Sequence, residues 1–184
     1  PTDEMRKAVY GGFGFIDTAE PLLMPVSKSF AQRAIIAAAL AEGTSHLHGY
    51  TPCGDNEAAL QVARNLGAEV DVNGTEVTIK GISASLGSMD MTELHVGESG
   101  LLTRIMIPVM AQLCAGPVTF TGEKTLLNRP LTGAREIMEA FEAECQSETD
   151  PVRVPLTVKG PLKAGRAEIS GKHGSQLISG LLMA

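Results

Sequence analysis

A segment of about 70 residues occurs twice in this chain of 184 residues, and it begins a third time near the end. Residues 27–43 have the pattern of an apolar helix stopped by a glycine, and residues 98–116 repeat it, with Arg104 following Arg33 at an offset of 71. Each of these helix patterns is followed by a short strand, an amphipathic helix and two more strands. Because fixed-length repeats fold as repeated supersecondary structures, the sequence predicts successive βαβαββ units.

The first helix of each unit indicates how the units pack. Residues 34–41 have no polar face, and a helix that is apolar all round is expected to be buried on every side. Ser29 and Gln32 have the spacing of a capping box, which predicts a helix start near Ser27 to Ser29. Pro108 is expected to kink or restart the matching helix of the second copy. The predicted fold is of the α/β (α+β) class, with buried central helices walled by mixed sheets.

The repeat also divides the chain into expected domains. We interpret residues 1–24 as a leader or a strand of a companion domain, and residues 25–184 as one amino-terminal domain. Its units span about 25–96, 97–168 and 169–184, and the third is incomplete because the sequence stops within an apolar helix pattern. The chain is therefore expected to be a fragment whose second domain is absent.

Composition excludes several classes of protein. There are 15 Lys and Arg against 21 Asp and Glu, a formal charge of −6, whereas nucleic-acid-binding surfaces are basic. No apolar run reaches the roughly 18 residues of a membrane span. The three cysteines are widely spaced, which suits reduced thiols in a cytoplasmic protein. His46 and His48 have the one metal-like spacing, but no Cys or carboxylate stands near them, so no metal and no cofactor are assigned.

Basic residues recur at the predicted amino ends of the apolar helices. Lys28 and Arg33 lie there in the first copy, Arg104 in the second, and Lys172 and His173 in the third. The free N–H groups and positive dipole at a helix amino end disfavour a cation unless an anion is bound nearby. Because the cations keep the register of the repeat, they predict a common site for phosphate and carboxylate groups.

Five ordered motifs carry a resemblance to a known family. Pro25-Val26-Ser27-Lys28-Ser29-Phe30-Ala31-Gln32-Arg33 is similar to its Pro-Gly-Ser-Lys-Ser-x-x-Asn-Arg motif. The others lie at residues 55–57, 97–104, 122–131 and 174–183. On these motifs residues 25–184 resemble the enolpyruvyl transferase family, and within it the EPSP synthases.

The resemblance implies a reaction and its residues. These enzymes transfer the enolpyruvyl (carboxyvinyl) group of phosphoenolpyruvate (PEP) to the 5-hydroxyl of shikimate-3-phosphate and release phosphate, in the shikimate pathway to chorismate and the aromatic amino acids. They use no metal or cofactor, and the intact protein is expected to be a cytoplasmic monomer. By resemblance, the shikimate-3-phosphate residues are Lys28, Ser29, Arg33, Ser175 and Gln176. The PEP residues are Lys28, Gly100, Arg104, Arg129 and Gln176, and Lys28 is also catalytic.

Departures from the motifs keep alternatives open. Glu98 stands where the family has a neutral Asn, and a carboxylate there is expected to repel PEP unless it is paired or turned away. Gly174 replaces a phosphate-binding Ser, and Lys172 or His173 would replace the lost contact. One alternative is a UDP-N-acetylglucosamine enolpyruvyl transferase, although the loop before Pro130 lacks that enzyme's reactive Cys. The other is a non-catalytic anion-binding homologue. The fragment is expected to be inactive alone.

Overall fold

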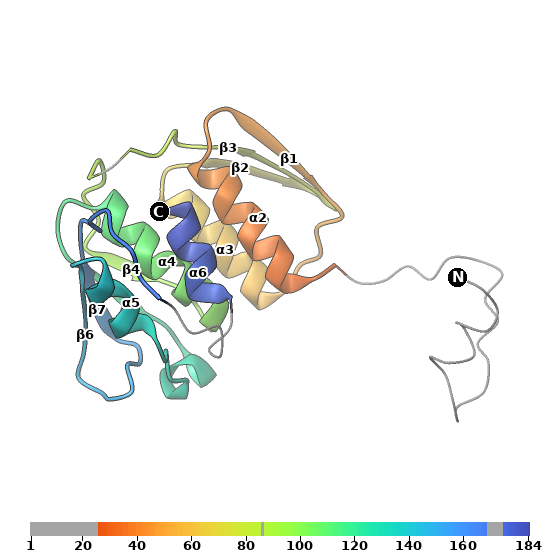
Figure 1. The fold of residues 1–184 in the computed structure, drawn as a ribbon. Helices are drawn as coiled ribbons and strands as arrows, with labels where there is room; N and C mark the ends of the chain where they lie inside the picture. The colour runs from red at the N-terminus through yellow and green to blue at the C-terminus, as the bar shows by residue number, and fades with distance from the viewer. Residues whose placement is uncertain (1–25, 86, 169–174) are drawn as a thin grey trace, which may run out of the picture.

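Two β-sheets wall a group of helices in the computed structural model, which describes residues 26–85, 87–168 and 175–184 (Figure 1). The first copy of the repeat contains α2 (Lys28–Leu40), β1 (Thr44–His48), α3 (Gly54–Asn65), β2 (Glu69–Asn73) and β3 (Glu76–Lys80). The second contains β4 (Glu93–His95), α4 (Gly100–Leu113), β5 (Val118–Thr121), the 3₁₀ helix η1 (Lys124–Asn128), α5 (Ala134–Ala140), β6 (Glu144–Ser147) and β7 (Leu156–Lys159). Helix α6 (Gln176–Met183) follows.

Three strands of the second sheet have the same arrangement as the three strands of the first. The first has the order β1-β3-β2, with both pairs antiparallel, and the second has the order β4-β5-β7-β6, in which β5-β7-β6 repeats that arrangement. Strand β4 adds a parallel edge next to β5. It lies just before the expected unit boundary near residue 97, and counted with the second copy it gives the order βαβαββ. The predicted α/β class, with helices walled by sheets, is confirmed.

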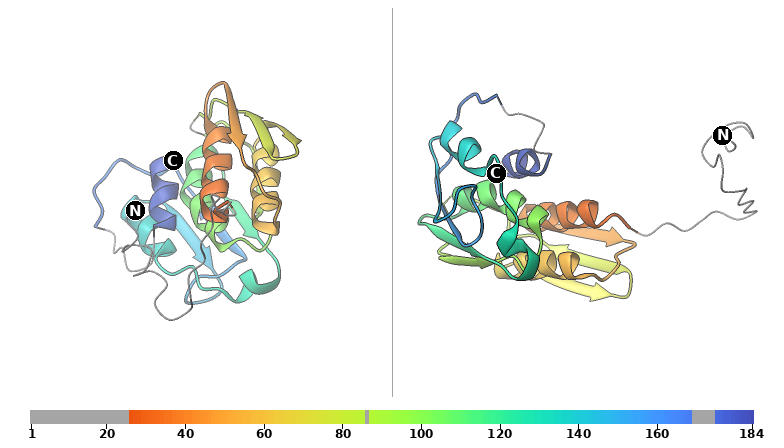
Figure 2. Two further views of the ribbon diagram at one scale, coloured as in Figure 1. Left: turned by 90° about the vertical axis from the view of Figure 1, so that its right-hand side faces the viewer. Right: turned by 90° about the horizontal axis from the view of Figure 1, so that it is seen from below.

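The first helices of the units, α2, α4 and α6, lie side by side with their amino ends at the same end of the molecule (Figures 1 and 2). Helix α4 is the most enclosed, and Met106, Ile107 and Met110 have no exposed surface. The prediction that residues 34–41 are buried on every side is wrong, because Ala37 is exposed within the described structure. Helix α2 therefore buries one face, through residues such as Ile35 and Ile36.

The start of α2 lies where it was expected, between Ser27 and Ser29, but its capping residue and the course of α4 at Pro108 differ from the prediction in part. The cap of α2 is Ser27, whose hydroxyl accepts a hydrogen bond from Phe30 N, rather than a box between Ser29 and Gln32. Helix α4 is continuous through Pro108 and does not restart there. The buried neighbours of α4 hold it together, although proline donates no backbone hydrogen bond. In the described ranges, no helix is both long and apolar enough to cross a bilayer.

Candidate functional site

The amino ends of α2 and α4 are joined by a buried polar contact. Ser99 Oγ donates a hydrogen bond to Gln32 Oε1 at 2.6 Å, and both residues are almost fully buried. Ser99 also caps α4 by accepting from Leu102 N, while Gln32 Nε2 donates to Lys28 O at 3.2 Å. Since each polar group is satisfied, this contact fixes the two helix ends against each other without an unpaired buried dipole.

Arg33 joins the same region to α6. Its Nε donates to Ser179 Oγ at 3.0 Å and its Nη2 to Ser175 Oγ at 3.4 Å, while Nη1 donates to Ser29 O at 2.9 Å. Gln176 is the first residue of α6 and directly follows Ser175. The four residues that the family resemblance implies for shikimate-3-phosphate, besides Lys28, thus lie at neighbouring helix ends.

A pocket of about 380 Å³ opens beside these ends. Lys28 lies on one side, where its Nζ is 3.3 Å from Asp55 Oδ2, and Arg129 also lines the pocket. The other charged lining residues are Glu98, Glu123 and Lys124. Cations and carboxylates therefore share the lining, and an anion that enters meets both.

Arg104 and Arg129 both lie close to Gly100 at the start of α4, and Arg129 also lines the pocket. A Cβ at position 100 would lie 3.0 Å from Arg104 Nη1, so this guanidinium would have to shift slightly, whereas Arg129 Cδ at 3.9 Å would be in ordinary van der Waals contact. Arg104 donates to Gly100 O at 2.9 Å and to Pro130 O at 2.6 Å. Burial, and then the charge of Arg129, lower the pKa of Arg104 from its ordinary value. Two arginines this close favour an anion between or beside them.

Glu98 faces the pocket but has partners of its own. Its Oε1 accepts a hydrogen bond from the Thr125 hydroxyl, and its Oε2 lies 3.9 Å from Lys124 Nζ. Thr125 Oγ1 in turn accepts from Arg129 Nη2 at 2.9 Å. The Thr125 hydrogen bond first, and then the positive charges of Lys124 and Arg129, lower the pKa of Glu98. The carboxylate is therefore paired and charged at neutral pH.

Sequence reasoning did not assign Thr125, Lys124 or Ser179 to this region. Thr125 lies four residues before Arg129, which is a contact spacing within one helical turn, and this was the available signal. Ser179 likewise lies four residues after Ser175. Lys172, His173 and Gly174 fall outside the described residues.

The cysteines and histidines take other positions. Cys53 lines the pocket and is half-buried, whereas Cys114 and Cys145 are buried, and burial raises the pKa of both thiols. His46 Nδ1 lies 3.2 Å from Thr78 Oγ1, and His48 pairs with Glu76. Across the described ranges, no cluster of three or more His, Cys, Asp or Glu side chains is arranged to hold a metal ion.

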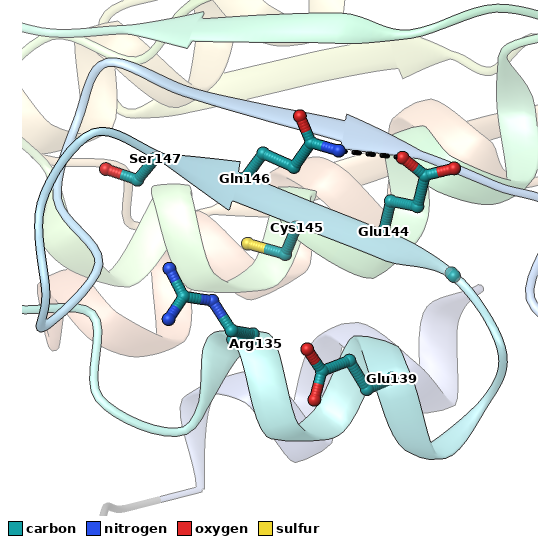
Figure 3. A pocket seen from close by; sticks show the side chains of 7 residues that line it. Arg135, Glu139, Glu144, Cys145, Gln146 and Ser147 are labelled. Atoms are coloured by element: carbon teal, nitrogen blue, oxygen red, sulfur yellow. Dashed lines mark hydrogen bonds between the residues drawn. The ribbon is translucent and has the colours of Figure 1, made fainter.

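A second hollow, of about 420 Å³, lies between α5 and β6. Figure 3 shows Arg135 and Glu139 on the helix facing the strand that carries Cys145. None of the residues predicted for the two substrates lines it. The pocket beside Lys28 and Arg129 is therefore the candidate site.

Comparison with known proteins agrees with this arrangement. A family model described as EPSP synthase (3-phosphoshikimate 1-carboxyvinyltransferase) matches residues 20–184. The 3-phosphoshikimate 1-carboxyvinyltransferase of Clostridium kluyveri is 33% identical over 161 residues, which are 88% of this chain and 37% of the relative. The protein of that name from Chlamydia felis is 34% identical, over 88% of this chain and 36% of the relative. The chain thus spans little more than a third of the length of these curated relatives.

Solved structures give a consistent result. A structure of EPSP synthase from Acinetobacter baumannii matches with a TM-score of 0.76 and 26% identity, over 88% of this chain and 37% of that one. The enolpyruvyl transferase NikO from Streptomyces tendae matches with a TM-score of 0.55 at 17% identity, which shows the fold alone. The fold and the family model together define an α/β domain of the EPSP synthase type. The chain belongs to the EPSP synthase (3-phosphoshikimate 1-carboxyvinyltransferase) family.

Proposed function

We propose that this chain supplies one half of the active site of an enzyme that transfers the enolpyruvyl group of PEP to the 5-hydroxyl of shikimate-3-phosphate. The supporting observation is that Lys28, Arg104 and Arg129 gather around the amino ends of α2 and α4. Two polyanionic substrates need several cations in fixed positions, and positioning plus electrostatic stabilisation are large terms in catalysis. The same proposal places the protein in the cytoplasm, without a metal or cofactor in the reaction.

The proposed reaction has two balanced steps. The 5-hydroxyl oxygen adds to C2 of PEP and loses its proton, while C3 gains one, which gives a tetrahedral intermediate. Phosphate then leaves C2 and C3 loses a proton, which restores the double bond as an enol ether. Both steps move charge on or beside phosphate groups, and this suits a cationic pocket with acid–base groups.

We assign roles within this half of the site by resemblance to the family motifs, and the positions of the side chains support them. Lys28 lies in the pocket and would contact both substrates and act in proton transfer, while Arg104 and Arg129 would hold PEP beside Gly100. The shikimate-3-phosphate residues would be Lys28, Ser29, Arg33, Ser175 and Gln176, with Gln176 also reaching PEP. The remaining acid–base groups would come from a second domain, because the chain covers about 37% of its relatives.

The test is turnover by the full gene product with PEP and shikimate-3-phosphate, followed by release of phosphate. Lys28→Met is expected to lower kcat by roughly 100-fold or more, the size seen when one stabilising donor is lost from an active site. Lys80→Met is the matched control, because Lys80 is an exposed lysine paired with Glu69 on the first sheet. Turnover with UDP-N-acetylglucosamine instead of shikimate-3-phosphate would contradict the proposed acceptor.

The 184 residues alone provide a second measurement. We expect them to bind shikimate-3-phosphate weakly and to produce no detectable EPSP, because only part of the acid–base machinery lies within them. Measurable product formation by this chain would show that the second half of the site is not needed.

A further inference from the structure

Glu98 is the one lining carboxylate that is tied to an arginine of the site within the described residues. It accepts from Thr125, which accepts from Arg129, and an ionised carboxylate has no proton to donate. The direction of this relay is therefore fixed: Arg129 donates to Thr125, and Thr125 donates to Glu98. The second carboxylate oxygen faces Lys124 at 3.9 Å.

The backbone holds Glu98 in this place. Gly97 before it has a φ of 58°, a conformation that favours glycine, and Ser99 after it is the buried cap of α4. Glu123 N donates to Gly97 O at 2.9 Å, which ties the start of η1 to the same turn. The carboxylate is thus held at the pocket and keeps 34% of its side-chain surface exposed.

We propose that Glu98 is a specificity-determining residue whose fixed negative charge weakens binding of anions in this pocket in proportion to their charge. The inference rests on the proposed function for the identity of the ligands. Its second part, that affinity for an anion in this pocket falls as the charge of the anion rises, is called the charge rule below. An anion that reaches Arg129 and Lys124 must compete with Glu98 for them, and it then lies near a carboxylate that keeps its negative charge. Coulomb repulsion grows with the charge of the ligand, so the penalty is largest for PEP and smallest for a monoanion.

The same penalty acts on the leaving product. Inorganic phosphate carries between one and two negative charges at neutral pH, so Glu98 also lowers its affinity for the pocket. Removing the charge is therefore expected to retain phosphate longer and to strengthen product inhibition.

The test compares affinities by calorimetry in the full gene product saturated with shikimate-3-phosphate. Glu98→Gln keeps an oxygen that accepts from Thr125 but removes the charge. We expect it to raise affinity for PEP roughly tenfold, for inorganic phosphate roughly fivefold and for pyruvate roughly twofold, following ligand charge.

Two matched variants complete the experiment. Glu69→Gln removes an exposed carboxylate that pairs with Lys80 at 2.7 Å on the first sheet and does not line the pocket, and we expect less than about a threefold change for each ligand. Thr125→Val breaks the relay without changing charge and is expected to weaken PEP binding severalfold. If Glu98→Gln weakens all three ligands as Thr125→Val does, Glu98 serves only to support Arg129 and the inference is overturned.

The two proposals fail in distinguishable ways. If the wild-type protein does not bind PEP, the proposed function fails. The ratio of the dissociation constants of wild type and Glu98→Gln for inorganic phosphate still tests the charge rule in that case. If neither anion binds the wild-type protein, appearance of phosphate binding in Glu98→Gln supports the rule and its continued absence overturns it.

Discussion

Arg33 Nε on α2 donates a hydrogen bond to Ser179 Oγ on α6 at 3.0 Å, although 146 residues separate the two positions. The contact joins the first helix of the first unit to the first helix of the third. It occurs beside Ser29 and Ser175, so a residue predicted to bind substrate also connects two repeats. The proposed substrate role of Arg33 therefore predicts that stability and ligand binding are coupled at this position.

Arg33→Lys tests this coupling. A lysine has a single ammonium and does not reproduce the fork that reaches Ser29, Ser175 and Ser179 together. We expect a loss of about 1 kcal/mol in the free energy of unfolding and a roughly tenfold or greater loss of shikimate-3-phosphate affinity. Chemical denaturation and calorimetry measure the two effects. Arg64→Lys, an exposed change on α3, is the control and should alter neither.

Gly180→Ala tests the contact between α4 and α6. A Cβ at position 180 would overlap Ile105 O and would lie 2.8 Å from Pro108 Cγ, so the helices would have to separate. Overpacking of this kind costs about 1–3 kcal/mol in the free energy of unfolding. Gly116→Ala is the control, because a Cβ there meets no atom within 4 Å. Equal melting temperatures for the two variants would contradict this close approach of the helices.

Ser99→Ala tests the buried link between the first two units. The change removes the cap of α4 and leaves Gln32 Oε1 without its donor, and each effect costs about 1 kcal/mol or more. We expect the free energy of unfolding to fall by about 2 kcal/mol in urea denaturation. Ser88→Ala, an exposed serine in a loop, provides the comparison and should stay within about 0.5 kcal/mol of wild type.

The buried thiol of Cys145 predicts a dependence of stability on pH. Burial raises its pKa to about 11, whereas the unfolded chain has an ordinary thiol. The unfolded state therefore loses its proton first, and stability falls as the pH rises from about 9 towards 11. Denaturation midpoints across this range should show the decline, and Cys145→Ala should reduce it. A midpoint that rises with pH would have the wrong sign.

Much of the fold was predictable because the sequence contains an internal repeat. The offset between Arg33 and Arg104 located the two apolar helices, and the order of strands after each followed from it. The exposure of Ala37 was not predictable in the same way, because it depends on which helix neighbours are present rather than on the polarity of α2 itself. The start of α2 was predicted between Ser27 and Ser29, but the choice of Ser27 as the cap was not, because two serines two residues apart offer the same chemistry.

The positions of the cations near the helix ends were predictable from the sequence, but the positions of their counter-charges were not. Helix-end position identified Lys28 and Arg104, whereas the contacts of Glu98 with Thr125 and Lys124 join the start of α4 to η1 across a strand. Contacts of that kind depend on the three-dimensional path of the chain, so no spacing rule indicates them. The assignments of the substrate residues remain predictions for the experiments above.

The hydrogen bond between Gln32 and Ser99 also constrains how these two repeats can diverge. Each side chain is buried, and each has its partner in the other copy. A mutation at one position leaves a buried polar atom without its hydrogen-bond partner at the other, which lowers stability. Single substitutions at either position are therefore disfavoured unless both positions change. We therefore expect related sequences to covary at these two positions, even where the rest of the duplicated units has lost its internal similarity.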